Sequence, residues 1–315
     1  MIYTVTLNPA LDKTVVIPSF AVDQVNRITG VRLDPGGKGV NVSKVIANLG
    51  GTSLAVVALG GTVGKSWKQL LQDCGFALHV IPAAGETRTN IKIMDPVGHT
   101  NTDINEPGAM IAKEVLEEWI GWMQEVLQSE DILVLSGSVP SAVGTDIYAR
   151  LVKLCGEKGI RTIVDAEGAL LVNALKGCPF LVKPNYHELA GYVGHELYTV
   201  EELVDAAKQM LAAGAQNVLV SLGNGGAVWC WCEENGILGQ LWARAPHVQV
   251  VSTVGAGDSM VGAVAFGLEQ KLTREDILRL AVASGTAAVT CDGSQAPTRE
   301  QILEMREAIC DLERG

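Results

Sequence analysis

Residues 252–259 read Ser-Thr-Val-Gly-Ala-Gly-Asp-Ser, and the apolar run Met260–Leu268 that follows them predicts a helix. An acidic residue in the first turn of a helix is ordinary, because it complements the helix dipole by ~0.3–1 kcal/mol. The two glycines before Asp258 are less ordinary, since they let backbone N–H groups converge on one point beside a carboxylate. Transfer of a phosphoryl group to a hydroxyl requires such a base and such fixed donors. A dinucleotide fingerprint is excluded, because G-x-G-x-x-G/A fails at Met260.

On either side of this segment, short β-rich apolar runs alternate with helical patterns. The predicted strands are Ile2–Leu7, Ser53–Leu59, Ile132–Leu135, Thr162–Val164, Phe180–Val182 and Asn217–Ser221. The predicted helices are Val40–Leu49, Trp67–Asp73, Ala112–Leu127, Thr145–Glu157 and Val200–Ala213, and the chain from Gly257 onward is also expected to be helical. Such alternation predicts an α/β fold, a doubly wound and mostly parallel sheet with helices on both faces.

Two regions depart from this alternation. Thr14–Pro35 and Glu86–Asp103 are polar and alternating, which predicts antiparallel strands that are solvated on one face. We interpret them as one small second sheet inserted at two points near the N-terminus. A hairpin is expected from Ala227–Trp231 to Ile237–Trp242, with Asn235-Gly236 as its tight turn.

The composition excludes several classes of protein. The chain has 315 residues, of which 48% are apolar and 19% charged, so it is expected to form one large globular domain or two smaller ones. Seven cysteines without metal or redox spacing indicate reduced thiols and a reducing compartment. The first residues look like a strand and not a secretory signal, and no apolar stretch approaches the ~20 residues of a membrane span. We therefore expect a cytoplasmic protein without a membrane partner.

The charge is unevenly distributed along the chain. The net charge is −11, yet residues 1–100 hold nine Lys and Arg against six Asp and Glu. Nucleic acid is a poor partner for such a surface. A small anion could still be bound by cations from the N-terminal third, or these cations could simply be solvated. The candidates are Arg27, Lys38, Arg88 and Lys92.

Two glycine-rich segments precede helical patterns. Gly60–Ser66 resembles a Walker A loop but is one residue too short to wrap a phosphate, so we expect a glycine-rich turn near the substrate instead. Pro35–Asn41 contains consecutive glycines and Lys38 at the start of a helix. That combination suits an anionic or polyhydroxylated ligand, although a structural turn with a solvated lysine explains it as well.

Two segments that follow predicted strands each allow two interpretations. Asn185 and Glu188 could hold a hydrated Mg²⁺, or they could form a helix cap with the same spacing. The loop Ser221–Ala227, which contains Gly223 and Gly226, could bind a nucleotide phosphate or could be only a turn.

Together these segments resemble the ribokinase-like (PfkB) carbohydrate kinases, and in particular the branch that phosphorylates sugar phosphates. The resemblance covers essentially the whole chain and runs through seven segments in the order of the family. They are Thr6–Asp12, Gly36–Val42, Thr87–Lys92, Ser136–Pro140, Val182–Asn185, Ser221–Gly223 and Val254–Ser259.

The resemblance implies ATP and Mg²⁺ as cofactors and assigns roles to matching residues. Asp258 would be the general base, with the N–H groups of Gly255, Ala256 and Gly257 stabilising the transferred phosphoryl group. The other implied roles are in ligand binding. Asp12 and Asn41 would bind the sugar hydroxyls, and the sugar and its phosphate would be bound by Gly37, Lys38, Arg88, Arg27 and Ser138. Asn185 and Glu188 would organise Mg²⁺, and the ATP phosphates would be bound by Lys183, Ser221, Gly223 and Gly226.

The resemblance also has consequences for organisation and substrate. It implies a single kinase domain over residues 1–315, with a discontinuous β lid at about 12–36 and 86–106 that covers the sugar and can form a homodimer. Residues Arg88–Ile93 look like the version that phosphorylates fructose 1-phosphate at carbon 6, with tagatose 6-phosphate as the alternative substrate. A nucleoside kinase and a non-catalytic sugar-phosphate sensor are the rival interpretations. Ser141-Ala142 and Glu167 depart from the family pattern, and both lie near the expected site.

Overall fold

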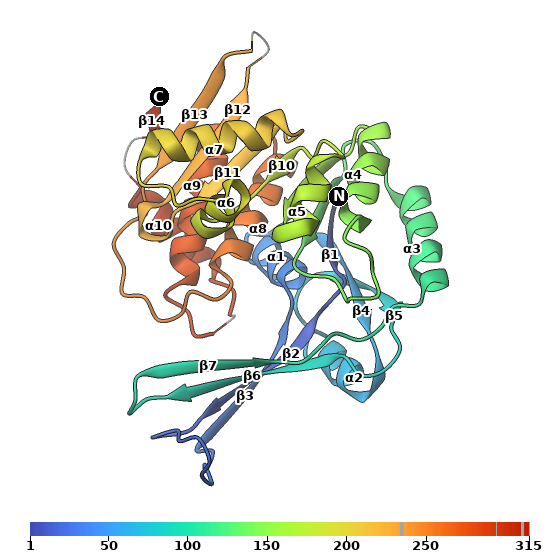
Figure 1. Cartoon of the computed structure of the whole chain (residues 1–315), viewed down its shortest axis with the longest axis vertical. Coiled ribbons are helices and arrows are strands. Elements are labelled where there is room, and N and C mark those ends of the chain that lie inside the picture. Colours follow the sequence, from blue (N-terminus) through green and yellow to red (C-terminus); the bar gives the residue numbers. More distant parts are fainter. Residues whose placement is uncertain (234–235, 294, 310–311, 315) are drawn as a thin grey trace.

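The computed structural model describes residues 1–314 except 234, 235, 294, 310 and 311. Its main sheet has the strand order β14-β13-β12-β11-β10-β9-β8-β1-β4-β5 (Figure 1). The strands from β11 to β5 run parallel, and β12, β13 and β14 continue the sheet antiparallel. Their bounds are β1 Ile2–Thr6, β4 Ser53–Leu59, β5 Ala77–Pro82, β8 Ile132–Ser136, β9 Arg161–Asp165, β10 Leu181–Val182, β11 Asn217–Ser221, β12 Ala227–Cys232, β13 Leu238–Ala243 and β14 Glu313–Arg314.

Helices cover both faces of the main sheet, as the alternating pattern predicts. One face carries α3 Lys113–Val126, α4 Ile147–Glu157, α5 Gly168–Leu175, α6 Tyr186–Val193 and α7 Val200–Ala212. The other carries α1 Lys38–Asn48, α8 Ala256–Glu269, α9 Arg274–Ala288 and α10 Arg299–Glu307, while α2 Gly61–Gln69 packs at the β4 end. None of the helices in the described part of the chain is both long and apolar enough to cross a membrane.

The central strands are apolar at every position because both of their faces are buried. In β1 the side chains of Tyr3 and Val5 enter the core under α3 and α4, while Ile2 enters the core under α1 and α8. The register pairs Val5 with Val56 of β4 and with Leu135 of β8. The two hydrophobic cores therefore fix the order of the strands and the direction in which their ends point.

A second sheet stands apart from the main one and has the order β3-β2-β6-β7. Its strands are β2 Ala10–Val16, β3 Gly30–Gly36, β6 Arg88–Asp95 and β7 Thr100–Asn105. The prediction that its strands are all antiparallel is wrong, because β2 and β6 pair in parallel. The reason is that β2 follows β1 and β6 follows β5, and both of those strands end at the same edge of the main sheet. The segments that follow β1 and β5 therefore leave the main sheet in the same direction.

The glycine-rich segment 60–66 was predicted to be a turn, but it forms the start of α2. The carboxylate of Glu86 occupies the N-terminus of this helix, since its Oε2 accepts a hydrogen bond from the Val63 N–H at 2.8 Å. Gly61 has φ +64°, and a Cβ there would collide with that carboxylate. The anion that this helix terminus attracts is thus supplied by the chain itself.

Other differences from the prediction concern short elements. Strands β5 and β14 and helix α5 were not expected, and Phe180 lies just outside β10. The hairpin β12–β13 is present, but Asn235 of its predicted turn lies outside the described residues.

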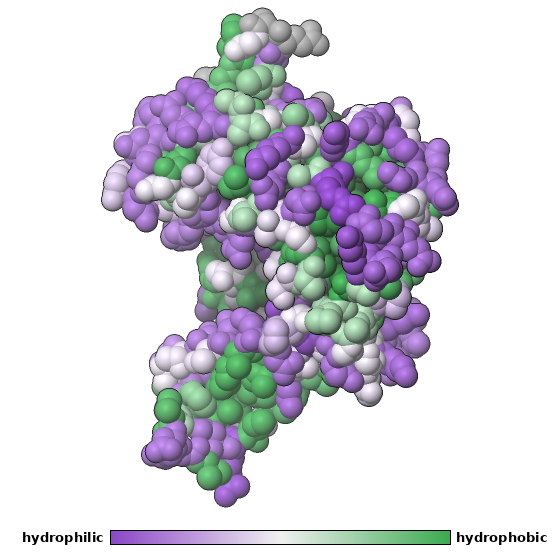
Figure 2. All heavy atoms as spheres, turned by 45° about the vertical axis from the view of Figure 1, so that its right-hand side comes forward, coloured by the Kyte–Doolittle hydropathy of each residue, from purple (hydrophilic) through white to green (hydrophobic). Residues whose placement is uncertain are grey.

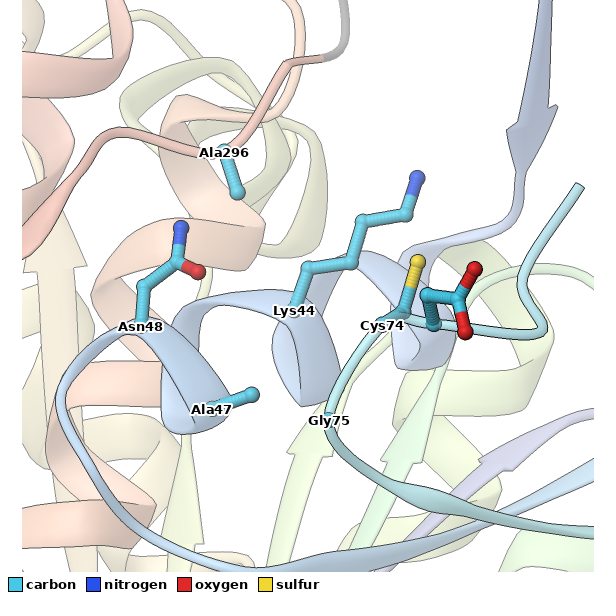
Figure 3. A pocket seen from close by; sticks show the side chains of 7 residues that line it. Lys44, Ala47, Asn48, Cys74, Gly75 and Ala296 are labelled. Atoms are coloured by element: carbon cyan, nitrogen blue, oxygen red, sulfur yellow. The ribbon is translucent and has the colours of Figure 1, made fainter.

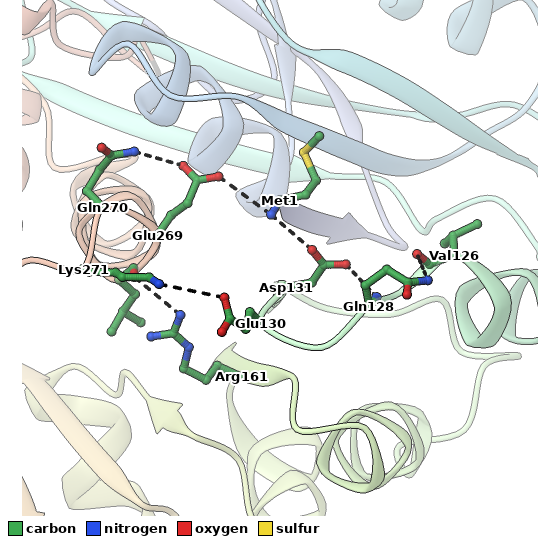
Figure 4. Close-up of polar contacts among 10 residues, drawn as sticks. Met1, Val126, Gln128, Glu130, Asp131, Arg161, Glu269, Gln270 and Lys271 are labelled. Carbon is green, nitrogen blue, oxygen red and sulfur yellow. Dashed lines mark hydrogen bonds and ion pairs between the residues drawn. The ribbon is translucent and has the colours of Figure 1, made fainter.

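The two edges of the main sheet differ in how their charges are arranged. At the amino edge, where the parallel strands begin, charged groups pair with one another (Figure 4). The N-terminal amino group lies 3.1 Å from Asp131 and 3.9 Å from Glu269, and Lys271 lies 3.9 Å from Glu130. These pairs tie the starts of β1 and β8 to the end of α8.

Candidate active site

Polar residues gather at the opposite, carboxyl edge of the main sheet, where α/β folds bind their ligands. Each comes at or just after the end of a parallel strand or the start of a helix on that edge. From the strands they are Asn8, Ser136, Asp165, Lys183 and Ser221, and from the helices Lys38, Asn41 and Asp258.

Asp258 is the third residue of α8 and only 6% exposed. Asn41 of α1 donates a hydrogen bond from Nδ2 to its Oδ2 at 2.8 Å. Burial, together with the negative charge of Asp165, raises the pKa of Asp258 to about 6, although Lys38, Asn41 and Lys183 act in the opposite direction. A carboxyl with this pKa is ionised at neutral pH and can take up a proton readily, as a general base must.

Asp165, at the end of β9, lies between two lysines. Its Oδ1 is 3.3 Å from Nζ of Lys183, and its Oδ2 is 3.4 Å from Nζ of Lys38. Burial acts to raise the pKa of this carboxyl, but the two lysines outweigh it and the pKa is lowered. No role for Asp165 is predicted from the sequence. The available signal was a carboxylate closing an apolar strand, which a buried site would have to neutralise.

The segment before Asp258 forms an anion-binding terminus. Gly255 is the N-cap of α8 with φ +80°, a left-handed conformation that suits glycine, and the helix begins at Ala256. The first N–H groups of a helix have no acceptor within it. Lys183 extends over this terminus, since a Cβ on Gly257 would lie 3.2 Å from its Nζ. Backbone donors and a buried ammonium thus converge beside Asp258, which suits a phosphoryl group.

Asp12 projects into the site from β2, opposite Asn90 of β6. Nδ2 of Asn90 donates to Oδ1 of Asp12 at 3.0 Å. The absence of a side chain at Gly36 makes room for this carboxylate, because a Cβ there would come within 1.9 Å of Asp12 Oδ2. Burial raises the pKa of Asp12, against the opposing effects of Asn90, Arg88 and Lys44. The pair offers a carboxylate oxygen and an amide oxygen to a polyhydroxylated ligand.

Arg88 completes this side of the site. Its Nη2 donates to the backbone oxygen of Asn8 at 3.1 Å, and Nδ2 of Asn8 donates to Oγ of Ser138 at 3.0 Å. Several buried polar atoms around these residues have no hydrogen-bond partner, which is costly unless a ligand supplies one. They are Thr6 Oγ1, Asn8 Oδ1, Arg88 Nε, Asn90 Oδ1 and Ser136 Oγ.

Not every residue that was predicted to bind the sugar phosphate lies in this part of the site. Gly37 does, as the N-cap of α1 with φ +138°, packed against Thr6. Arg27 does not, because it is exposed in the loop between β2 and β3, at the far end of the second sheet. Lys92 Nζ lies 3.9 Å from Asp103 on the neighbouring strand β7.

The two residues predicted to organise Mg²⁺ form a capping box at the start of α6. Oδ1 of Asn185 accepts from the Glu188 N–H, and Oε2 of Glu188 accepts from the Asn185 N–H, each at 2.8 Å. The helix-cap interpretation therefore holds. Glu188 Oε1 remains for a metal-bound water, which fits the way Mg²⁺ keeps most of its hydration shell. Within the described ranges, no group of three or more His, Cys, Asp and Glu could hold a metal by itself.

The loop after β11 is held mainly by its own contacts. Ser221 ends the strand, and Gly223–Gly225 form a short 3-10 turn whose Gly225 oxygen accepts from Trp242 Nε1 at 2.9 Å. A Cβ on Gly226 would lie 1.9 Å from the backbone oxygen of Ala243, so packing alone requires this glycine. Gly223, with φ +57°, has open space at the same position and leaves the backbone accessible to a phosphate.

The departures from the expected motif lie on the surface of this edge. Ser141 and Ala142 form an exposed turn, and Glu167 is the exposed N-cap of α5. None of the three enters the buried cluster around Asp165, so that cluster does not depend on their identity.

A doubly wound sheet with a buried carboxylate, Asp258, beside a helix N-terminus, and with Lys183 near that terminus, is typical of phosphotransferases that use an alcohol as acceptor. A family model described as pfkB family carbohydrate kinase matches residues 5–301. A 1-phosphofructokinase of Bacillus subtilis (strain 168) is 36% identical over 305 residues, which cover 97% of each chain.

Solved structures agree with this match. Phosphofructokinase-2 of Escherichia coli, in complex with fructose-6-phosphate, is 32% identical, covers 98% of each chain and has a TM-score of 0.89. Ribokinase of Arabidopsis thaliana, complexed with ribose and ATP, is 22% identical, covers 97% of this chain and 98% of its own, and with a TM-score of 0.77 shows the shared fold. The chain belongs to the PfkB carbohydrate kinases, and the predicted family, ribokinase-like fold and kinase activity are confirmed.

Proposed function

We propose that this protein is a 1-phosphofructokinase, which transfers the γ-phosphoryl group of ATP to O6 of fructose 1-phosphate and releases fructose 1,6-bisphosphate and ADP. The observation that carries the proposal is the juxtaposition of Asp258 with the N-terminus of α8 and Lys183. The name of the Bacillus subtilis relative supports the choice of substrate.

Asp258 acts as the base in this reaction. Its carboxylate accepts the proton of the sugar hydroxyl, while the Asn41 amide holds Oδ2 and leaves Oδ1 toward the substrate. The N–H groups of Gly255, Ala256 and Gly257 and the ammonium of Lys183 stabilise charge on the transferred group. Mg²⁺ bound with ATP would offset the charge of the phosphates, and Asn185 and Glu188 would hold it through water.

The sugar phosphate occupies the polar face at the base of the second sheet. Asp12, Asn41 and Asn90 bind its hydroxyls, because their oxygens and amides line this face. Arg88, with its unpartnered Nε, binds the phosphate on carbon 1 together with Lys38, Ser138 and the N-terminus of α1 at Gly37. ATP lies on the other side of Asp258, toward Ser221 and the open Gly223.

The second sheet serves as a lid within a single kinase domain. The face of this sheet that bears Asp12 and Asn90 is polar, while its opposite face exposes Val31, Leu33 and Ile104. Figure 2 shows apolar side chains gathered on this part of the molecule. A second copy of the chain would cover that face in a homodimer, and Arg27 at the tip of the lid could then reach a substrate phosphate only across the interface.

The state of the thiols supports a reducing compartment. The six cysteines in the described part of the chain are all free, which suits a reducing environment such as the cytoplasm.

A steady-state comparison of kcat/KM with Mg-ATP tests the substrate. The four acceptors are fructose 1-phosphate, tagatose 6-phosphate, fructose 6-phosphate and unphosphorylated fructose. We expect fructose 1-phosphate to be preferred by about a hundredfold or more over fructose, since a charge-assisted contact to the phosphate contributes about 1.5–3 kcal/mol and several converge here. A preference for tagatose 6-phosphate would instead identify the protein as a tagatose-6-phosphate kinase. Turnover of none of the four would contradict the proposal.

A further inference from the structure

Lys44 lies one turn after Asn41 on α1 and has no role in the proposal above. Its ammonium points back along the helix and makes two hydrogen bonds. It donates to the backbone oxygen of Pro35 at 2.7 Å and to Oδ1 of Asn41 at 3.4 Å. Figure 3 shows its side chain extended from α1 beside Cys74. Lys44 can therefore influence the site through the groups that it holds and through its charge.

The contact with Asn41 determines which way the amide of that residue faces. An ammonium can only donate hydrogen bonds, so it selects the oxygen of the carboxamide and turns the NH₂ group away. That NH₂ group donates to Oδ2 of Asp258 at 2.8 Å. Without the ammonium, the amide could rotate by half a turn and place its oxygen against the carboxylate, which would repel it. Lys44 therefore selects the orientation that supports an ionised Asp258.

The contact with Pro35 connects the same ammonium to the lid. Pro35 is the next-to-last residue of β3, the lid strand that leads into α1. The acidic groups that face Lys44 come from several elements, namely Cys74 after α2, Asp34 on β3, Asp12 on β2 and Asp258 on α8. Burial lowers the pKa of Lys44 in spite of these four groups. Its charge is thus placed between the lid carboxylates and the base.

We propose that Lys44 is a positioning residue, which fixes the Asn41 amide against Asp258 and ties the lid strand β3 to the same helix. This inference rests on the proposed role of Asp258 as the base. Lys44 does not touch the substrate in this scheme. Its removal should therefore change the rate of the chemical step and its pH dependence more than the binding of sugar or ATP.

A pocket beside Lys44 makes the inference testable by chemical rescue. The pocket has a volume of about 470 Å³ and opens where the Lys44 side chain lies (Figure 3). Its other lining residues are Ala47, Asn48, Asp73, Cys74, Gly75 and Ala296. When the side chain is shortened to alanine, this space can admit a small alkylammonium ion that replaces the missing donor.

The experiment compares Lys44→Ala and Lys44→Arg with Lys68→Ala, a control at an exposed lysine of α2. Turnover is measured with whichever sugar phosphate the wild-type protein uses best, so that an error in the substrate does not affect the result. We expect Lys44→Ala to lower kcat by about tenfold to a hundredfold, as displaced positioning contacts do, with both KM values within about threefold. Lys44→Arg should retain most of the activity, and the control should retain all of it.

Two further measurements separate positioning from a merely structural role. The acid limb of kcat/KM should move to higher pH in Lys44→Ala, because Asp258 loses an oriented donor and still faces Asp165, with Lys38 and Lys183 as its remaining cations. Ethylammonium should restore activity to this variant in a saturable way and leave the control unchanged.

The outcomes that overturn the inference are equally definite. They are an unchanged kcat and acid limb in folded Lys44→Ala, or a loss that ethylammonium does not restore. The inference is also contradicted if Lys44→Ala lowers kcat in the Asp258→Asn variant by as much as it does in the wild type. A residue that acts through the Asp258 carboxylate has no carboxylate to act on in that variant. If Asp258→Asn alone keeps wild-type turnover, the proposed function fails first, and this result is distinct from all three.

Discussion

The two edges of the main sheet are built from the same strands but differ in how completely their polar groups are paired. At the amino edge, the N-terminal amino group and Asp131, and likewise Lys271 and Glu130, pair with one another. At the carboxyl edge, Asp165 likewise lies against Lys38 and Lys183, but other polar atoms, such as Arg88 Nε, have no partner. One edge is thus completed by the chain itself, whereas the other leaves polar atoms that a ligand would complete.

The direction of the elements explains the difference. Helices α1 and α8 begin at the carboxyl edge, so the positive ends of their dipoles and their free N–H groups meet there. Anions gain from this environment, and Asp165 and Asp258 are the anions that the chain places in it. The raised pKa of Asp258 indicates that burial outweighs this gain, a cost in stability that is common at functional sites.

The largest expected effect comes from removing the proposed base at the carboxyl edge. Asp258→Asn should lower kcat by ~10²–10⁴, the usual contribution of a positioned base, and should leave the binding of the sugar phosphate within a few-fold. Steady-state kinetics together with equilibrium binding of the sugar phosphate measure the two effects separately. Asp131→Asn makes the same chemical change at the amino edge and should leave kcat unaltered. Near wild-type turnover in Asp258→Asn would remove the distinction between the edges.

A smaller effect is expected from Arg88, whose Nε lacks a partner. Arg88→Ala should raise the KM for the sugar phosphate by about tenfold to a hundredfold, since a charge-assisted contact in a closed site contributes about 1.5–3 kcal/mol. The KM for ATP should change little. Arg150→Ala, which removes the exposed pair with Glu117, is the matched control. A raised KM for ATP with an unchanged KM for the sugar phosphate would show that Arg88 belongs to the ATP half of the site, and the assignment would be wrong.

The pH dependence should also distinguish the edges. Because the pKa of Asp258 is raised to about 6, kcat/KM should fall about tenfold for each pH unit below that value. A carboxyl with a raised pKa binds its proton more tightly in the folded state, so its contribution to stability falls as the pH rises from about 4 to about 6.

Asp258→Asn should therefore be more stable than the wild type at pH 8, by about 1–3 kcal/mol, and this advantage should shrink at pH 5. Urea unfolding at the two pH values measures it. An Asn variant that is less stable than the wild type at pH 8 would show that Lys38 and Lys183 dominate the environment of Asp258.

The smallest effect is expected at the amino edge. Asp131→Asn weakens the contact with the N-terminal amino group and should lower the free energy of unfolding by about 0.5–1.5 kcal/mol. Thermal unfolding in low and high salt measures this, and salt should reduce the difference because it screens a half-exposed pair. A change in kcat would show that the two edges are coupled through α8.

The sequence predicts the parts of the site that lie close together along the chain. Residues Gly255–Asp258 carry their own turn, helix terminus and carboxylate, so their arrangement follows from local rules. The pairing of Asp165 with Lys38 and Lys183 does not, because it depends on which strand ends lie beside which helix start. The contact of Glu86 with the N-terminus of α2 could not be predicted for the same reason, because it joins residues that are 23 positions apart in the sequence.

The fold follows a similar division. The alternation of strands and helices predicts the doubly wound sheet, whose strands are buried on both faces. The parallel pairing of β2 with β6 escapes such reasoning, because the two strands are brought together only by the ends of β1 and β5. β14 consists of two residues, too few for any periodicity.

All four connections of the second sheet to the main sheet and its helices lie at one edge. Among the described residues, its own core has only Val15, Ile17 and Ile93 as buried members. So small a core cannot keep β2, β3, β6 and β7 closed as firmly as the main sheet is kept. Amide hydrogens in these strands should therefore exchange through local opening, while those of β1 and β8 exchange only when the whole chain unfolds. We therefore expect two cooperative units within the kinase, of which the one that carries Asp12 and Arg88 would become ordered when a sugar phosphate binds.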